Sequence, residues 1–400
     1  MVYLNKKGFT ILEILIVIFL IGVFSAILFF AFNSLDVIKR ARDSRRINDL
    51  QVLNSAIQIL LNQNPDVFLG NENLIYLSLP DNNSNCSFYL SKLPPLYLPF
   101  SYRCVTSDNL RKINGQGWLP FNFSNLLLGI SSLPIDPLNN ADYFYSYITK
   151  GNKYKLTAKM ESENFSLAML DDGGIEPLLY EVGSDLKIPS PQSGLVLYLP
   201  FEEGTGTIAY DLSGYENDGF LYNFDFNSSS RWVKGKSGWG LKFDGVNDYV
   251  LIPTSTSLDF RNKDFTISLW VFKENLSESR IVSQNENLTI SCSQINFGTN
   301  SENKFKIDFY NCNSIIISSK SLNLSNWYNL VYSNSKNDSE PDKIFFNGSK
   351  DNEGGLGNYL GNPLSIKLGA YQYQGILDEL RIYSRKINDL EAKLLYYSAK

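Results

Sequence analysis

The feature that most constrains this chain is an apolar run near its N-terminus, residues 9–32, which contains one charged residue, Glu13. A helix of roughly 20 apolar residues can cross a bilayer, so the run predicts a transmembrane helix. The hydrophobic region of a secretory signal peptide is shorter, about 7–15 residues, and ends at a small-residue cleavage site. Because a carboxylate in hydrocarbon is costly unless it is paired, Glu13 is a candidate functional residue.

The residues around the start of this run give Glu13 a partner. Two lysines, Gly8, the aromatic Phe9 and then Glu13, the fifth residue after the glycine, follow in that order. This arrangement resembles the prepilin leader of type IV pilins and of type II secretion pseudopilins. The resemblance implies a leader at 1–8, cleavage between Gly8 and Phe9 by a prepilin peptidase, methylation of the new N-terminus, and pairing of Glu13 with the Phe9 amine of a neighbouring pilin subunit. The alternative is an ordinary membrane anchor with a snorkelling Glu13.

The helical pattern continues beyond the apolar run. Ile47, Leu50, Leu53, Ile57 and Leu61 recur at helical spacing before Pro65, which predicts one long helix over 9–62. Its charged stretch "ARDSRRINDL" resembles a helix of pseudopilin-like proteins; the alternative is a solvated helix face with intrahelical ion pairs. The resemblance places the leader in the cytoplasm and the later domains outside the inner membrane.

Residues 63–180 have strand and loop character. Two strands are predicted, Tyr143–Thr149 and Lys153–Met160, around the turn "KGN". The "LPIDP" turn resembles the end of the globular part of pseudopilin-like subunits, which implies an α+β domain with the long helix packed on a small antiparallel sheet. Asp136, between two prolines, is expected to form a turn.

Charge and composition exclude several function classes. The chain has no histidine, which excludes Ser-His-Asp, Cys-His and zinc-histidine sites and leaves carboxylate chemistry or oxygen-ligated metals. The formal charge is −5, which argues against nucleic acid as the main partner.

The second half of the chain predicts an all-β domain. Residues 181–194 read as a linker, because they contain Pro189, Pro191 and Gly194 without an apolar period. From residue 195 to 400, short aromatic strands alternate with Asn/Gly/Ser/Asp turns. Segments such as "WGLKFDGVNDYVLIP", "FTISLWVF" and "GILDELRIYSRKINDLEAKLLY" resemble the laminin-G-like, concanavalin A-like jelly roll.

The jelly-roll resemblance implies a binding module and, in many members, a structural calcium ion. Calcium prefers carboxylate and carbonyl oxygens, and the loops "YDLSGYEND" and "FDGVNDY" can supply them. The candidate ligands are Asp211, Asn217, Asp244 and Asp378. The alternative is that each side chain caps a turn.

Some members of this fold are glycoside hydrolases, which need two carboxylates on one face about 5–5.5 Å apart. Adjacent strand residues point to opposite faces. The pairs Asp378 and Glu379, and Glu202 and Glu203, are adjacent. We therefore expect no catalytic residues and no enzyme.

The four cysteines form two local pairs. In an exported chain they are expected to be oxidised. Cys86 and Cys104 flank a proline-rich loop, and Cys292 and Cys312 lie in two segments that could pair as a hairpin. The alternative is four buried free thiols.

Together these features predict a minor pilin or pseudopilin. It would be a single-pass protein of the cytoplasmic membrane, assembled in a filament, that displays a lectin-like domain outside the cell for binding carbohydrate or a surface protein. The alternatives are a surface lectin that does not polymerise and a glycoside hydrolase.

Overall fold

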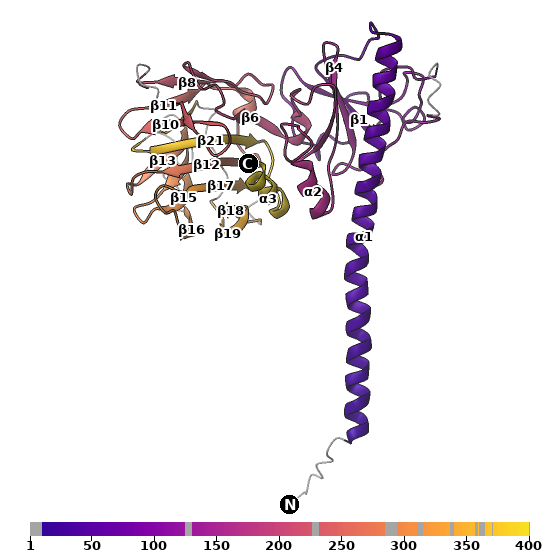
Figure 1. Ribbon diagram of the computed structural model, residues 1–400, viewed down its shortest axis with the longest axis horizontal. Coiled ribbons are helices and arrows are strands. Elements are labelled where there is room, and N and C mark those ends of the chain that lie inside the picture. The colour runs from indigo at the N-terminus through magenta and orange to yellow at the C-terminus, as the bar shows by residue number, and fades with distance from the viewer. Residues whose placement is uncertain are drawn as a thin grey trace, which may run out of the picture.

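A computed structural model describes residues 10–124, 130–225, 232–284, 294–309, 315–336, 340–356, 359, 365–369 and 371–399, with the side chains of residues 26–34 left out. Two β-rich domains lie side by side next to one long helix (Figure 1). We call residues 64–194 the first domain and residues 195–399 the second domain.

Helix α1 runs from Ile11 to Gln63, so its 53 residues span about 80 Å. Its N-terminal half extends away from both domains, and its C-terminal half packs on the first domain (Figure 1). The helix ends before Pro65, which cannot continue it. The predicted long helix is confirmed over the described residues.

The first domain is a five-stranded sheet on which α1 lies. Its strands are β1 (Leu74–Pro80), β2 (Ser101–Val105), β3 (Tyr145–Lys150), β4 (Lys153–Ala158) and β5 (Tyr180–Gly183), in the order β2-β1-β3-β4-β5. The predicted hairpin is confirmed as β3 and β4. The sheet is not wholly antiparallel, because β1 and β2 are parallel. A short helix that the sequence did not predict, α2 (Glu163–Met169), follows the hairpin.

The contact between α1 and this sheet is apolar. Leu50, Leu53 and Ile57 of α1 are fully buried in one cluster with Tyr147 and Leu156 of the sheet. These three helix residues recur at three- and four-residue intervals, which puts them on one face of the helix.

The second domain is a sandwich of two eight-stranded sheets. One sheet has the order β19-β18-β17-β12-β21-β10-β9, with β6 beside β21, and the other the order β16-β15-β14-β13-β20-β11-β8-β7. The first sheet contains β6 (Leu195–Leu199), β9 (Trp232–Lys234), β10 (Trp239–Asp244), β12 (Phe265–Lys273), β17 (Trp327–Asn334), β18 (Asp342–Phe346), β19 (Ser349–Gly354) and β21 (Gln374–Tyr383). The second contains β7 (Ile208–Ala209), β8 (Gly219–Tyr222), β11 (Tyr249–Ile252), β13 (Ser279–Gln284), β14 (Ile295–Thr299), β15 (Lys304–Phe309), β16 (Ile315–Ser321) and β20 (Ile366–Leu368).

The pairs between neighbouring strands of the sandwich are antiparallel, and its two inner faces share one large apolar core. Helix α3 (Asp389–Ser398) closes the domain beside the first domain, and two 3₁₀ turns cover Pro191–Ser193 and Thr256–Leu258 (Figure 1). The predicted fold class, an α+β domain followed by an all-β sandwich, is confirmed.

The segment 181–194 is not a free linker. Its first residues complete β5, and Ile188, Ser190, Gln192 and Ser193 are buried. Its prolines and Gly194, which has a φ of 89°, shape a packed turn against the second domain. The segment predicted as a linker from its composition is therefore a packed turn that connects the two domains.

The two domains share a hydrophobic core of their own. Met160, Met169 and Leu178 of the first domain form one buried cluster with apolar residues of the second domain, Leu195, Tyr198, Val331, Phe345, Tyr383, Ile387, Ala392, Leu394 and Leu395. Burial of this size favours a fixed arrangement over independent domain motion.

Candidate functional site

The described part of α1 begins with a capping box. The Thr10 amide donates to Glu13 Oε2 at 2.8 Å, and the Glu13 amide donates to Thr10 Oγ1 at 3.2 Å. The lone carboxylate of the apolar run thus has a partner inside its own chain. The signature Thr-x-x-Glu, which marks helix starts, could have revealed this in the sequence. Gly8 and Phe9, the predicted cleavage and methylation site, lie outside the described residues.

The N-terminal part of α1 is apolar on every side. All described residues from 10 to 25 are exposed, and the large apolar ones among them are Ile11, Leu12, Ile14, Leu15, Ile16, Val17, Ile18, Phe19, Leu20, Ile21, Val23 and Phe24. A helix of this kind is normally covered by other helices or by lipid. In the part of the chain that the structure describes, no helix is sufficiently long and apolar to cross a membrane. The predicted span 9–32 also includes residue 9 and the side chains of 26–32, which are not described.

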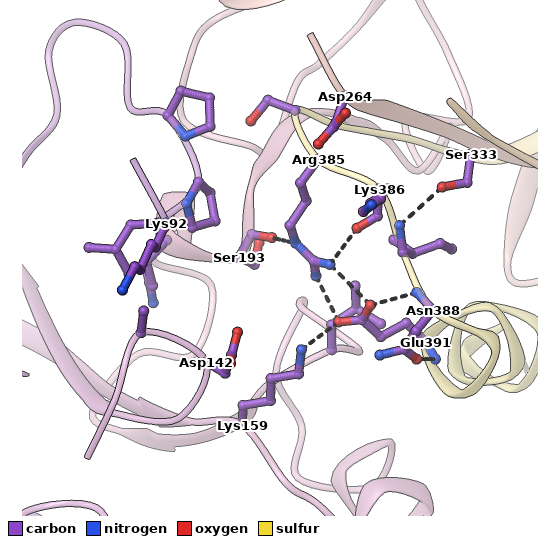
Figure 2. A pocket seen from close by; sticks show the side chains of 18 of the residues that line it. Lys92, Asp142, Lys159, Ser193, Asp264, Ser333, Arg385, Lys386, Asn388 and Glu391 are labelled. Carbon is purple, nitrogen blue, oxygen red and sulfur yellow. Dashed lines mark hydrogen bonds and ion pairs between the residues drawn. The ribbon is translucent and has the colours of Figure 1, made fainter. Parts of the chain in front are cut away.

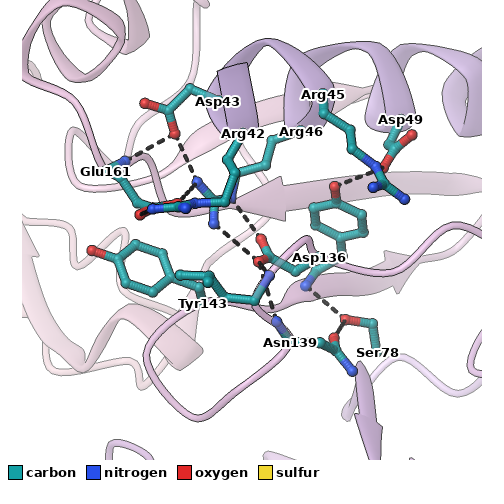
Figure 3. A network of polar contacts seen from close by, with 12 residues as sticks. Arg42, Asp43, Arg45, Arg46, Asp49, Ser78, Asp136, Asn139, Tyr143 and Glu161 are labelled. Atoms are coloured by element: carbon teal, nitrogen blue, oxygen red, sulfur yellow. Dashed lines mark hydrogen bonds and ion pairs between the residues drawn. The ribbon is translucent and has the colours of Figure 1, made fainter. Parts of the chain in front are cut away.

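A buried ion network fastens α1 to the first domain (Figure 3). The Arg46 guanidinium, fully buried, donates to both carboxylate oxygens of Asp136 at 2.6 and 3.0 Å. It also donates to Asp43 at 2.8 Å and to Glu161 at 2.6 Å. Burial alone would lower the pKa of Arg46, but these carboxylates raise it above its usual value. The cation and its anions hold each other in place.

Two expectations change because of this network. The charged face of "ARDSRRINDL" is only partly solvated: Arg45 is exposed, but Asp43 and Arg46 are completely buried. Asp136 does form a turn, since its carboxylate accepts from the amides of Leu138 and Asn139, and it also binds Arg46. The predicted turn residue is thus also the main anchor for the helix.

One of the two predicted disulfides is present. Cys86 and Cys104 are bonded, with their Cα atoms 5.1 Å apart, and both are buried beside β1. The other predicted pair, Cys292 and Cys312, lies outside the described residues, and so does the segment "NLTISC" of the hairpin expected there. The second segment of that hairpin forms β15, which pairs with β14.

The four candidate calcium ligands do not converge. The Asp211 carboxylate already accepts from the amides of Tyr198, Ser213 and Asn217 and from the Ser213 hydroxyl. Among the described residues, no group of three or more acidic or cysteine side chains is placed to hold a metal ion. The individual geometry of each candidate fits turn capping, and calcium binding stays a prediction.

The other three candidates have different surroundings. Asn217 donates to the Val196 carbonyl and to Ser257, and Asp244 accepts from the amides of Val246 and Asn247. Asp378 accepts from the amides of Lys236 and Ser237. Burial, with the nearby Glu379 carboxylate, raises the pKa of Asp378 to about 8.

The expectation that Asp378 and Glu379 point to opposite faces is wrong. Strand β21 bulges here: the register with β12 shifts, and Glu379 has a φ of 55°. The neighbours Leu377 and Leu380 both enter the sandwich core, so the two acids between them lie on the outer face. Glu379 is bound by Tyr198 and Arg381.

A cleft of about 980 Å³ lies between the two domains (Figure 2). On its floor, Glu391 at the start of α3 accepts from Lys159 at 2.9 Å and from Arg385 at 3.0 Å. Arg385 also donates to the Ser193 carbonyl. Burial raises the pKa of Glu391, but the two cations outweigh it and lower that pKa to about 2. Nothing in the sequence pattern indicated this cleft, because its walls come from distant segments.

Two family models match this chain. Residues 3–29 match the prokaryotic N-terminal methylation motif, and residues 244–393 match the concanavalin A-like lectin/glucanases superfamily. The chain therefore carries a type IV pilin-like methylation motif followed by a laminin-G-type, concanavalin A-like domain. The motif suggests a pilin-like protein anchored in a membrane, and the domain suggests lectin-like binding. No curated protein matches the chain.

Several solved structures are similar to this chain. One is the binding domain of Paraclostridial mosquitocidal protein 1, with 19% identity, coverage of 52% of this chain and 52% of that chain, and a TM-score of 0.42. Another is domain 4 of AbnA, an extracellular arabinanase from Geobacillus stearothermophilus, with 17% identity, coverage of 52% and 98%, and a TM-score of 0.40. Trypanosoma rangeli sialidase has 15% identity, coverage of 67% and 46%, and a TM-score of 0.40. The chain spans about half the length of the first and the third, and at such identities and scores we draw nothing further from them.

Proposed function

We propose that this protein is a minor pilin or pseudopilin: a membrane-inserted filament subunit that displays a lectin-like domain outside the cell. The observation that carries the proposal is the apolar, uncovered N-terminal part of α1, which lies within the residues that match the methylation motif. An exposed apolar rod of this kind gains free energy only where lipid or other apolar helices cover it. A pilin-like subunit supplies both surroundings, lipid before assembly and neighbouring helices afterwards.

The anchoring of α1 fits this role. When a filament subunit is pulled through its helix, the force must be transmitted to its folded domains. The buried Arg46 network links α1 to the first domain, because its carboxylates come from the helix and from two loops of that domain. The second domain is fixed in turn to the first by the shared apolar cluster. The helix, the first domain and the sandwich would therefore move as one body.

Glu13 would have two successive partners. In the single chain, the capping box holds its carboxylate at the N-terminal end of α1. In a filament, the same carboxylate would pair with the Phe9 ammonium that cleavage creates on a neighbouring subunit. A buried charge pair of this kind fixes register because leaving either charge alone is costly.

The second domain would bind extracellular carbohydrate or a surface protein, without catalysis. A calcium ion bound through its loops remains part of the proposal for this domain. A single-pass surface lectin that does not polymerise is the competing function. It would use the same membrane anchor, and it would need neither the cleavage at Gly8 nor the charge of Glu13.

Mass spectrometry of the mature N-terminus tests this proposal. The wild-type protein purified from membranes should begin at a methylated Phe9. Gly8→Val should retain Met1, because a branched side chain does not fit where the peptidase needs a bare backbone, whereas the neighbouring leader change Asn5→Ala should be processed normally. An unprocessed Met1 N-terminus on the wild-type protein would contradict the proposal.

A further inference from the structure

The cleft between the domains is rich in positive charge. Its described lining residues include seven cations, Lys92, Lys159, Lys263, Lys336, Lys343, Arg385 and Lys386, but four acids, Asp142, Asp264, Glu340 and Glu391. The whole chain, by contrast, has a formal charge of −5. The local sign is thus opposite to that of the molecule, which favours an anionic occupant.

Part of this charge is not used by the fold. Glu391 and Glu340 pair with Lys159, Arg385 and Lys386. Lys92 and Lys336 are exposed and form no ion pair with any described residue. Lys92 comes from the first domain, where its ammonium lies 5.7 Å from the centre of the Phe88 ring, and Lys336 comes from the second. Each wall is therefore lined by one ammonium that has no ion pair among the described residues.

A buried amide points to a ligand independently of the charge. Gln192 lines the cleft and is 5% exposed. Its Nε2 donates to the hydroxyls of Ser146 and Thr157, which fixes the amide, but its Oε1 has no hydrogen-bond partner among the described residues. A buried acceptor without a donor is destabilising, and a hydroxyl of a ligand would supply the missing hydrogen bond.

The neutral lining residues resemble a site for sugars more than one for nucleic acid. Hydroxyls and amides are frequent among them: Ser91, Thr157, Gln192, Ser193, Ser333, Ser335, Ser384 and Asn388. Phe144 is the single aromatic residue among the described lining residues, so the stacking surfaces that single-stranded nucleic acids use are missing there. Figure 2 shows Lys92 and Asp142 on one side of the cleft and Asp264 and Lys386 on the other.

We propose that this interdomain cleft binds a segment of an acidic polysaccharide, with sugar carboxylates between Lys92 and Lys336 and a sugar hydroxyl donating to Gln192 Oε1. This inference rests on the proposed role of the protein as a displayed binding subunit, and it names the class of ligand and the place. Both domains build the site, so it depends on the fixed arrangement that their shared apolar cluster provides.

Binding of a galacturonic acid oligosaccharide to the full chain in detergent micelles, measured by calorimetry in the presence of a chelator, tests the proposal. The wild-type protein should bind it, more weakly as salt is added. Lys92→Glu/Lys336→Glu should bind at least about tenfold more weakly. The matched control is Lys150→Glu/Lys153→Glu, which makes the same charge change on the exposed β3–β4 turn and should bind like the wild type.

Gln192→Met should also weaken binding, and its unfolding midpoint shows whether the fold is kept. Three results would overturn the proposal: no binding by the wild type, equal binding of a neutral oligosaccharide of the same length, or stronger binding of a single-stranded oligonucleotide. Binding in micelles needs no filament. A failure to bind the oligosaccharide would therefore not contradict the proposed cleavage and assembly, and a failure of cleavage or assembly would not contradict binding in the cleft.

Discussion

The ammonium of Lys159, at the end of the first domain's sheet, lies 2.9 Å from the carboxylate of Glu391 in the last helix of the chain. These residues are 232 positions apart in the sequence. Glu391 also accepts from Arg385 and forms a capping box with Asn388 at the start of α3. The Glu391 carboxylate therefore caps the N-terminus of α3 and also links the two domains through its ion pair with Lys159.

Glu391→Gln should lower the free energy of unfolding at pH 7 by about 2–3 kcal/mol, because the carboxylate accepts charge-assisted hydrogen bonds from two cations. The pKa of Glu391 is lowered to about 2 in the folded protein, so its contribution is complete above the unfolded value of about 4.3 and is lost as pH falls from there toward 2. Urea unfolding from pH 7 to pH 3 should show the difference between variant and wild type shrinking below pH 4.5.

The matched control for this prediction is Glu340→Gln. Glu340 also pairs with a lysine of the cleft, Lys386, but the side chain is 52% exposed. Because solvent screens such an exposed pair, its loss should change the stability far less than the loss of the Glu391 carboxylate. A difference at Glu391 that stays constant from pH 7 to pH 3 would show that the pKa of this carboxyl is the same in the folded and the unfolded protein, so that its charge adds nothing to stability.

Arg46→Met should destabilise the first domain by about 3–5 kcal/mol, because it leaves the buried carboxylates of Asp43 and Asp136 without their cation. Arg45→Met, one residue earlier on the same helix, removes an exposed cation and should cost about 0.5 kcal/mol or less. Thermal unfolding of the two variants in detergent gives the comparison. Equal shifts of both melting temperatures would show that the network is not a structural anchor.

Asp211→Ala should lower the stability of the second domain by about 2–4 kcal/mol, because its carboxylate accepts three amide hydrogen bonds and one from a hydroxyl. Measuring the loss both in millimolar calcium and in chelator also shows whether Asp211 takes part in the proposed calcium site. Asp244→Ala, which frees only two amides of an exposed turn, should cost less. A melting temperature that rises with calcium in the wild type and not in Asp211→Ala would instead establish Asp211 as a calcium ligand.

Features that depend on neighbouring residues in the sequence were predictable. The long helix, the β3–β4 hairpin and the Cys86–Cys104 disulfide follow from local periodicity, turn residues and short spacing. The capping box of Thr10 and Glu13 is equally local, because its two residues are three positions apart.

Features that depend on distant residues were not predictable. Arg46 binds Asp136 and Glu161, which lie 90 and 115 residues away in the sequence. No pattern within the helix indicates these partners. The bulge at Glu379 arises from a shift in register against β12, so alternation along β21 gave the wrong face for one acid. The segment 181–194 has the composition of a linker, but composition carries no information on what packs against it.

The incorporation of Glu13 variants into filaments is the most direct test of the proposed assembly role. Glu13→Gln keeps a side chain that can complete the capping box with Thr10 but removes the charge, and Thr10→Val removes the cap but keeps the charge. After shearing of cells, the amount of the subunit in the filament fraction is divided by the amount in the membrane. An uncompensated Phe9 ammonium costs about 3–5 kcal/mol, so the ratio for Glu13→Gln should fall by roughly a hundredfold or more, while Thr10→Val stays near the wild type. Equal ratios for Glu13→Gln and the wild type would contradict the account and leave Glu13 with its helix cap alone.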